Sequence, residues 1–229
     1  MNSLVMKTFT DFAHWKKVEY FWLIVALIVV GLGSWQASPL EFTAALTNVV
    51  CVILVAKGRV SNYYWGTIGV ITYGIVSYNT GLYANAALNA IYLPMQFIGI
   101  YYWTKDLGKT PAKADVAVKT ITLRDVITYL VVGVIFWYGL TEYLKTTQDP
   151  FPALDAFCLV ASLIAMWMMI KQQPEQWILW IIINCVTIYL WVIPALDQPG
   201  SWAQVAQWAV FLMNAFYGLW KWYITKTNK

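Results

Sequence analysis

The chain has 229 residues, of which 60% are hydrophobic, 17% aromatic and only 11% charged. Soluble domains average roughly 45–50% apolar and about 25% charged residues, so this composition excludes a water-soluble globule with a catalytic domain of its own. The formal net charge is +4, and the three cysteines show neither disulfide-framework nor zinc-site spacing. We therefore expect a membrane protein that holds no metal or other cofactor and binds no nucleic acid.

Eight apolar segments have roughly the 17–25 residues that a helix needs to cross a bilayer. In chain order they cover residues 20–36, 41–56, 63–79, 82–103, 123–144, 153–170, 176–193 and 201–223. Their apolar runs are continuous, unlike the alternating strands of an outer-membrane barrel. The sequence therefore predicts an all-α, polytopic membrane protein with eight transmembrane helices.

The basic residues alternate between loops. We number the loops between the apolar segments from the N-terminus. Of the 15 Lys and Arg residues, only Lys145 lies in an odd-numbered loop, and the others lie in the tails and even-numbered loops. Because cytoplasmic loops are enriched in Lys and Arg, both termini are predicted to be cytoplasmic. Lys16 and Lys17 before the first apolar segment would also fit a secretory signal, but we expect this segment to be an uncleaved helix.

A three-helix pattern occurs twice. Glu41 lies 16 residues before Lys57, as Asp155 does before Lys171. At slightly larger offsets, Trp65 and Trp103 correspond to Trp180 and Trp220. The predicted parts are a tail with an extra N-terminal helix (1–39), a first repeat (40–104), a cytoplasmic loop with a linker helix (105–152), and a second repeat with the cytoplasmic tail (153–229). Parallel repeats of this 3+1+3 kind hold a solute between them in small transporters.

Few residues are of a kind that would support enzymatic chemistry. The sole histidine, His14, lies in the predicted cytoplasmic tail, and the chain has no H-E-x-x-H or P-loop motif. Glu41 and Asp155 begin spans on the predicted outer side, where a helix N-terminus stabilises an acid by roughly 0.3–1 kcal/mol. Helix capping and attraction of a cationic solute are the two interpretations of these acids. We predict that the protein is not an enzyme.

Polar side chains inside the spans are candidates for the binding site, because such groups are costly in hydrocarbon and usually face the bundle interior. One face of the 82–103 span carries Asn85, Asn89, Tyr92, Gln96 and Gly99, and one face of the 201–223 span carries Gln204, Gln207, Phe211, Asn214 and Gly218. Asn89 and Gln96 precede Gln207 and Asn214 by 118 residues. Substrate binding and hydrogen bonding between helices are both open for these amides.

The 176–193 span carries the most distinctive pattern, because Trp177, Trp180 and Asn184 share one helical face. An aromatic plane one turn from an amide suits a flat heterocycle with amide or hydroxyl groups. Trp191, on the same face, fits an interfacial aromatic belt instead. Asn48 and, 114 residues later, Ser162 are further polar candidates.

The spans lack charged residues near their middles. A phosphate group would find no cationic partner there, so phosphorylated solutes are disfavoured. Trp and Tyr rings can instead hold a cation, at roughly 0.5–2 kcal/mol. The absence of a carboxylate at this depth favours a uniporter over an ion-coupled carrier.

Several segments together resemble one family. They are Ser61-Asn62-Tyr63, Leu82-Tyr83-Ala84, Pro94 to Gly99, Asp155-Ala156, Gln176 to Trp180 with Asn184, and Phe211 to Asn214 with Tyr217-Gly218. They are similar to the PnuC-type nicotinamide riboside transporters, a bacterial inner-membrane family related to the SWEET sugar transporters. The resemblance covers about residues 40–222. It implies facilitated uptake of nicotinamide riboside, a form of vitamin B3, and trapping by a separate cytosolic kinase.

The resemblance also has implications for the site. By matching positions, Trp177, Trp180, Asn184 and Gln96 are implied as substrate-binding residues, in a homo-oligomer for which a trimer is suggested. Relatives carry thiamine or riboflavin, so these vitamins are alternative substrates. A non-transporting membrane sensor or scaffold is the alternative from another functional class.

Overall fold

The structure is a computed structural model that describes residues 12, 15–33, 38–79, 83–106, 117–197 and 202–227. Its helices are α2 (Lys17–Gly33), α3 (Pro39–Ala56), α4 (Asn62–Asn79), α5 (Tyr83–Lys105), α6 (Leu123–Leu144), α7 (Pro152–Ile170), α8 (Gln176–Asp197) and α9 (Trp202–Thr227). Each predicted span coincides with one of these helices to within four residues at either end. The all-α prediction is therefore confirmed, whereas His14 lies outside the described residues.

Four of these helices, α3, α6, α7 and α8, are long and apolar enough to cross a membrane on length and composition alone. The others fall short for two reasons: α2 has only 17 residues, and α4, α5 and α9 contain more amides, glycines and tyrosines. Polar residues of that kind usually face the interior of a membrane bundle. The helices with lower hydropathy therefore carry most of the candidate polar groups.

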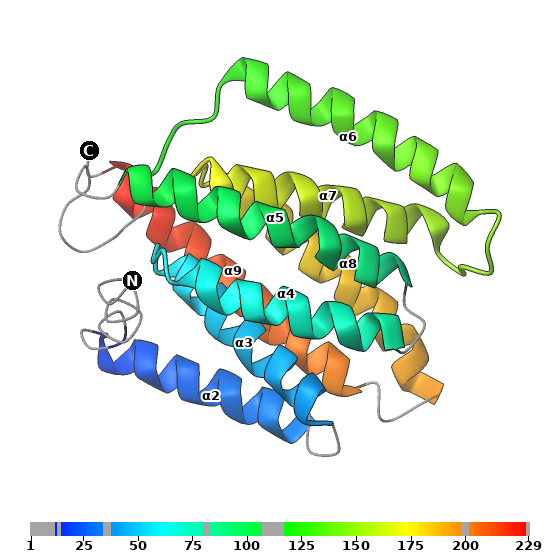
Figure 1. Cartoon of the computed structure of the whole chain (residues 1–229), viewed down its shortest axis with the longest axis horizontal. Coiled ribbons are helices and arrows are strands. Elements are labelled where there is room, and N and C mark those ends of the chain that lie inside the picture. Colours follow the sequence, from blue (N-terminus) through cyan, green and yellow to red (C-terminus); the bar gives the residue numbers. More distant parts are fainter. Residues whose placement is uncertain are drawn as a thin grey trace.

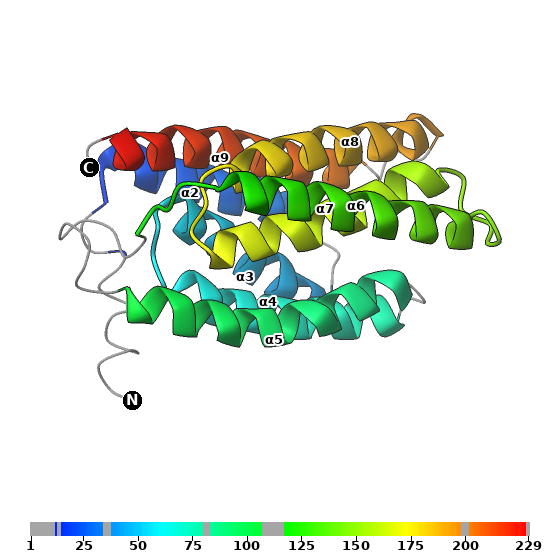
Figure 2. The same cartoon turned by 90° about the horizontal axis from the view of Figure 1, so that it is seen from above.

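The helices form a bundle with α3 and α7 in the middle (Figure 2). α4 and α5 lie on one side of them, and α2, α8 and α9 lie on the other. The two middle helices make corresponding contacts. α3 packs on α4 and α9, and α7 packs on α8 and α5. Among the described helices, α6 packs on α7 alone and stands at the outer edge of the bundle (Figure 1).

The predicted cytoplasmic connections gather at one end of the bundle, where the described chain also begins and ends (Figure 1). We call this the basic end, and define it by Lys57, Lys171 and Lys221. The turns after α3 and α7 have the same left-handed backbone conformation there, with φ of 66° at Gly58 and 63° at Gln172. These turns match at the 114-residue offset that separates Lys57 from Lys171.

We call α3–α5 the first half of the bundle and α7–α9 the second half, and two tryptophans tie these halves together. Trp103 Nε1 donates to the Met169 carbonyl over 3.1 Å, and Trp222 Nε1 donates to the Val55 carbonyl over 3.1 Å. The last helix of each half is thus bonded to the first helix of the other. The predicted correspondence of Trp103 with Trp220 is wrong, because Trp222 makes the equivalent hydrogen bond and Trp220 is 60% exposed.

The outer acids differ in their local roles. Glu41 completes a capping box with Ser38 at the start of α3, in which each residue's side chain accepts a hydrogen bond from the other's backbone N–H. α7 has no side-chain cap, and Asp155 simply lies in its first turn. The capping interpretation therefore describes Glu41 and does not describe Asp155.

Candidate functional site

A cluster of buried aromatic side chains joins the two halves near the basic end. Tyr63 and Trp103 come from the first half, and Trp177 and Trp222 come from the second. The ring centroids of Trp103 and Trp222 lie 5.8 Å apart, and the other two rings meet this pair edge to face. Such pairs prefer edge-to-face or offset geometry. These four side chains therefore form a packed layer near the basic end, which we call the base. Residues farther from the basic end are described as deeper.

The three predicted residues of α8 extend inward from this base. Trp177 is buried and packs so closely on Gly218 of α9 that a Cβ atom there would lie 2.5 Å from its ring. Trp180 is partly buried and borders two core clusters. Asn184, one turn deeper, is 3% exposed. The structure thus places an aromatic plane one helical turn from a buried amide.

Gln96 and Asn214 both leave an amide oxygen without a partner. Gln96 Oε1 is buried without a hydrogen-bond partner among the described residues, and the side chain lies against Gly66 within the first half. Asn214 Nδ2 donates to the Val52 carbonyl of the other half over 2.9 Å, while its Oδ1 has no partner among the described residues. A buried acceptor without a hydrogen bond costs about 1–3 kcal/mol, so these atoms call for a ligand or water.

Two other predicted residues, Asn89 and Asn48, make their contacts inside one half. Asn89 donates to the Asn85 carbonyl of its own helix and faces Gly74 of α4. The Asn48 amide packs against Gly69 between α3 and α4. These two amides therefore fit the helix-packing interpretation better than substrate binding.

Tyr92 and Gln207 have different surroundings. Tyr92 borders the aromatic cluster and faces the Ser162 hydroxyl across the contact between α5 and α7. Gln207 is partly buried on α9 and hydrogen-bonds none of the other candidates within the described chain. The structure therefore supports Tyr92 as a residue of the junction and gives no such support to Gln207.

The alignment of α5 with α9, the third helices of the two predicted repeats, also differs from the prediction. Gly99 faces Tyr63 just as Gly218 faces Trp177, which gives an offset of 119 residues between α5 and α9. The amide pairs at 118 residues are therefore one position out of register. Because one residue turns a helix by about 100°, Gln96 and Asn214 point to different neighbours.

Sequence reasoning missed three buried polar side chains near the base. Gln176 is fully buried with both amide atoms unpaired, and Asn62 Oδ1 and the Tyr63 hydroxyl have no hydrogen-bond partner in the described chain. Asn62 and Gln176 begin α4 and α8, 114 residues apart. That shared offset was the signal that could have identified them.

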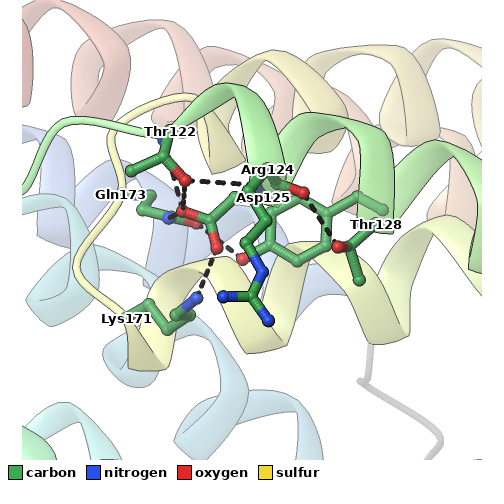
Figure 3. Close-up of polar contacts among 7 residues, drawn as sticks. Thr122, Arg124, Asp125, Thr128, Lys171 and Gln173 are labelled. Atoms are coloured by element: carbon green, nitrogen blue, oxygen red, sulfur yellow. Dashed lines mark hydrogen bonds and ion pairs between the residues drawn. The ribbon is translucent and has the colours of Figure 1, made fainter.

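Charged groups gather at the basic end in two matching ion pairs. Lys57 pairs with Glu19 of α2 over 2.6 Å and lies over the Trp15 ring. Lys171 pairs with Asp125 of α6 over 2.6 Å, and Figure 3 shows Asp125 between Lys171 and Gln173. The first turns of the two helices outside the predicted repeats thus hold the lysines that follow α3 and α7.

These ion pairs change the ionisation of the lysines in opposite directions. Burial lowers the pKa of the Lys57 ammonium to about 8, although Glu19 opposes this shift. The hydrogen bond to Asp125 raises the pKa of Lys171, which is more exposed. Both lysines are engaged at the basic end, and no Lys or Arg lies near the middle of a described helix.

An apolar groove on the outside of α8 and α9 is separate from these residues. It is lined by Ile178, Phe216, Leu219, Trp220, Tyr223 and Ile224. None of the predicted site residues lines it, and its side chains face outward from the bundle. The groove is therefore part of the apolar outer surface and not of the candidate site.

Comparison with known proteins gives the family. A family model described as "Nicotinamide mononucleotide transporter" matches residues 38–224. The chain belongs to this family. Its members are membrane transporters and not enzymes, so the sequence prediction of a transporter and the resemblance on which it rested are confirmed.

Individual relatives are similar over most of their length. The "Nicotinamide riboside transporter PnuC" of Neisseria mucosa is 34% identical over 221 residues, which cover 92% of this chain and 82% of that protein. The protein of the same name from Haemophilus influenzae is 28% identical, over 93% of this chain and 94% of its own. A solved structure described as "Crystal structure of the Vitamin B3 transporter PnuC" matches with a TM-score of 0.80 and 30% identity, covering 97% of both chains.

Proposed function

We propose that this protein takes up nicotinamide riboside across a bacterial inner membrane by facilitated diffusion. The observation that carries the proposal is a set of buried polar atoms that have no hydrogen-bond partner among the described residues, namely Trp177 Nε1 and Asn214 Oδ1 at the junction of the halves and Gln96 Oε1 within the first half. A solute with a carboxamide and ribose hydroxyls satisfies such atoms, whereas lipid cannot. The residues at 40–104 and 153–229 act as the two repeats that enclose it, and both termini face the cytoplasm.

The chemistry of the site favours the riboside over the mononucleotide that names the family model. The nicotinamide ring of the riboside is cationic and flat, which suits the face of Trp180, and Asn184 lies one turn away for the carboxamide. The added phosphate of the nucleotide would need a cation. Lys57 and Lys171 are already paired with acids at the basic end, and the helix interiors of the described chain offer no other.

Two further properties belong to this proposal. A cytosolic kinase traps the solute by phosphorylation, since the phosphate group prevents its return through a site without cations. The protein acts as a homo-oligomer, with a trimer as the expected assembly, in the lipid bilayer. The apolar face of α6 supports an oligomer or lipid contact, because among the described helices α6 packs only on α7 and exposes Ile127, Leu130, Ile135 and Phe136.

Binding to the purified protein tests the choice of solute. We expect isothermal titration calorimetry to show saturable binding of nicotinamide riboside and at least tenfold weaker binding of nicotinamide mononucleotide, thiamine and riboflavin. Stronger binding of thiamine or riboflavin would transfer the proposal to that vitamin. Uptake into proteoliposomes that contain only this protein separates a carrier from a sensor or scaffold, which would bind without transport.

Two substitutions on α8 test the site itself. Trp180→Ala and Asn184→Ala are each expected to weaken nicotinamide riboside binding by at least tenfold, because one removes the stacking plane and the other an amide (about 1.4 kcal/mol each). Trp191→Ala on the same helix is the matched control and is expected to keep the affinity. Calorimetry and a melting curve measure both properties. Unchanged affinity in the two site variants, with folded protein, would show that the solute binds elsewhere.

A further inference from the structure

Residues 117–119 cross the basic end of the bundle at the junction of the halves. Val118 is buried in the same cluster as Trp103 from the first half and Trp222 from the second. Ala117 beside it is also buried. The Val118 side chain therefore fills the place where the halves would have to separate to open this end.

Polar contacts with Gln172 and Asp106 hold this segment in place. The Ala117 N–H donates to Gln172 Oε1 over 2.5 Å, and Gln172 Nε2 donates to Asp106 Oδ2 over 2.9 Å. The Lys119 N–H donates to the Gln172 carbonyl over 3.0 Å, and the Lys119 ammonium pairs with Asp106 over 2.7 Å. Gln172 thus connects the end of α5, residues 117–119 and the turn between α7 and α8.

The backbone of Gln172 indicates that this connection has a specific role. Its φ of 63° is in the left-handed region, which a side chain with a Cβ atom disfavours. The equivalent position of the first half is Gly58, which adopts a φ of 66° without that cost. The two hydrogen bonds of the Gln172 side chain offset the unfavourable conformation. Because Gly58 has no side chain, only the second half can hold a segment in this way.

We propose that residues 117–119 are a latch that closes the solute path at the basic end, and that Gln172 is the residue that holds the latch shut. The proposal rests on the transport function proposed above, because release of the solute toward the basic end requires this junction to open. The latch is a short segment outside the helices, held by a few polar contacts and by the buried side chains of Ala117 and Val118. It can therefore open without unfolding a helix, as low-stability local openings do.

Cysteine labelling tests whether Gln172 holds the latch. Val118→Cys is introduced into a chain whose Cys51, Cys158 and Cys185 are replaced by alanine, and a water-soluble maleimide is added to the purified protein. We expect slow labelling that becomes at least tenfold faster with Gln172→Gly, since glycine keeps the turn but removes the two hydrogen bonds of the side chain. Gln173→Ala is the matched control, because Gln173 bonds Asp125 and Tyr129 instead of the segment. Equal labelling with and without Gln172→Gly, or an equal rise with Gln173→Ala, would overturn the proposal.

A reversible cross-link tests whether opening is needed for transport. Lys119 and Gln172 are joined by a backbone hydrogen bond, so cysteines at both positions lie close enough to form a disulfide. We expect oxidation to lower nicotinamide riboside uptake into proteoliposomes at least tenfold and a reductant to restore it. Full uptake by the cross-linked protein would contradict the latch. If the unmodified chain takes up no nicotinamide riboside, the transport proposal fails, while the substrate-free labelling still decides the latch.

Discussion

Glu19→Gln is expected to destabilise the protein by about 3–5 kcal/mol, the usual cost of leaving a buried charge without its partner. The Lys57 and Glu19 side chains are only 6% and 10% exposed, and their charged atoms lie 2.6 Å apart. The same carboxylate accepts hydrogen bonds from the Tyr217 hydroxyl and the Lys221 ammonium. Its loss would therefore weaken the polar contacts that join α2 to Lys57, which follows α3, and to Tyr217 and Lys221 of α9. Chemical unfolding in detergent micelles measures the change.

The destabilisation by Glu19→Gln should depend on pH in a defined direction. Burial lowers the pKa of Lys57 to about 8, so between pH 8 and 10.5 the folded protein binds fewer protons than the unfolded chain and this group adds stability as pH rises. Without Glu19 the pKa of Lys57 falls further, so the variant begins to gain this stability at a lower pH. The difference in unfolding free energy between the wild type and Glu19→Gln is therefore largest near pH 6 and becomes smaller toward pH 8.

Glu142→Gln is the matched control for this prediction. Glu142 also pairs with a lysine, Lys145, over 2.6 Å, but both side chains are about half exposed, at 47% and 57%. Exposed pairs of this kind contribute little to stability. The control is expected to unfold at the wild-type midpoint at every pH. A Glu19→Gln variant that behaves like this control would show that the buried pair does not anchor α2.

Gly218→Ala and Gly99→Ala are expected to destabilise the bundle by about 1–3 kcal/mol each, because they overpack a filled core. A Cβ atom at Gly218 would lie 2.5 Å from the Trp177 ring, and one at Gly99 would lie 2.1 Å from the Tyr63 ring. Both rings are buried against other aromatic side chains, so the helix backbones must shift instead. Melting curves in detergent measure the loss of stability. Gly218→Ala should also weaken solute binding, since it displaces Trp177.

Gly139→Ala on α6 is the matched control for the two glycine variants. An added Cβ atom there has nothing within 4 Å, so only the helix propensity changes. Alanine is favoured over glycine inside a helix by roughly 0.5–1 kcal/mol, so this variant is expected to be as stable as the wild type or slightly more so. If all three variants have the same melting temperature, the close approach of α9 to Trp177 is not a constraint on the fold.

The candidate site was only partly predictable from sequence. Periodicity placed Trp177, Trp180 and Asn184 on one face of α8, and the structure has that face pointing into the core. The same reasoning grouped Asn89 with Gln96, although Asn89 bonds its own helix and faces Gly74. Periodicity gives the direction of a side chain relative to its own helix axis. It does not show which neighbouring helix that direction meets.

Sequence by itself determined the membrane class, the eight helices of the described part of the chain, their ends within a few residues and the single end at which the basic turns gather. These properties depend on the composition and local patterns of each segment, which need no partner. Tertiary structure alone decided that Trp222 and not Trp220 bonds the other half, that Glu19 neutralises Lys57, and that Gln172 holds residues 117–119. Each of these contacts depends on the rotation and packing of helices far apart in the chain, and a change of one residue in register turns a side chain by about 100°.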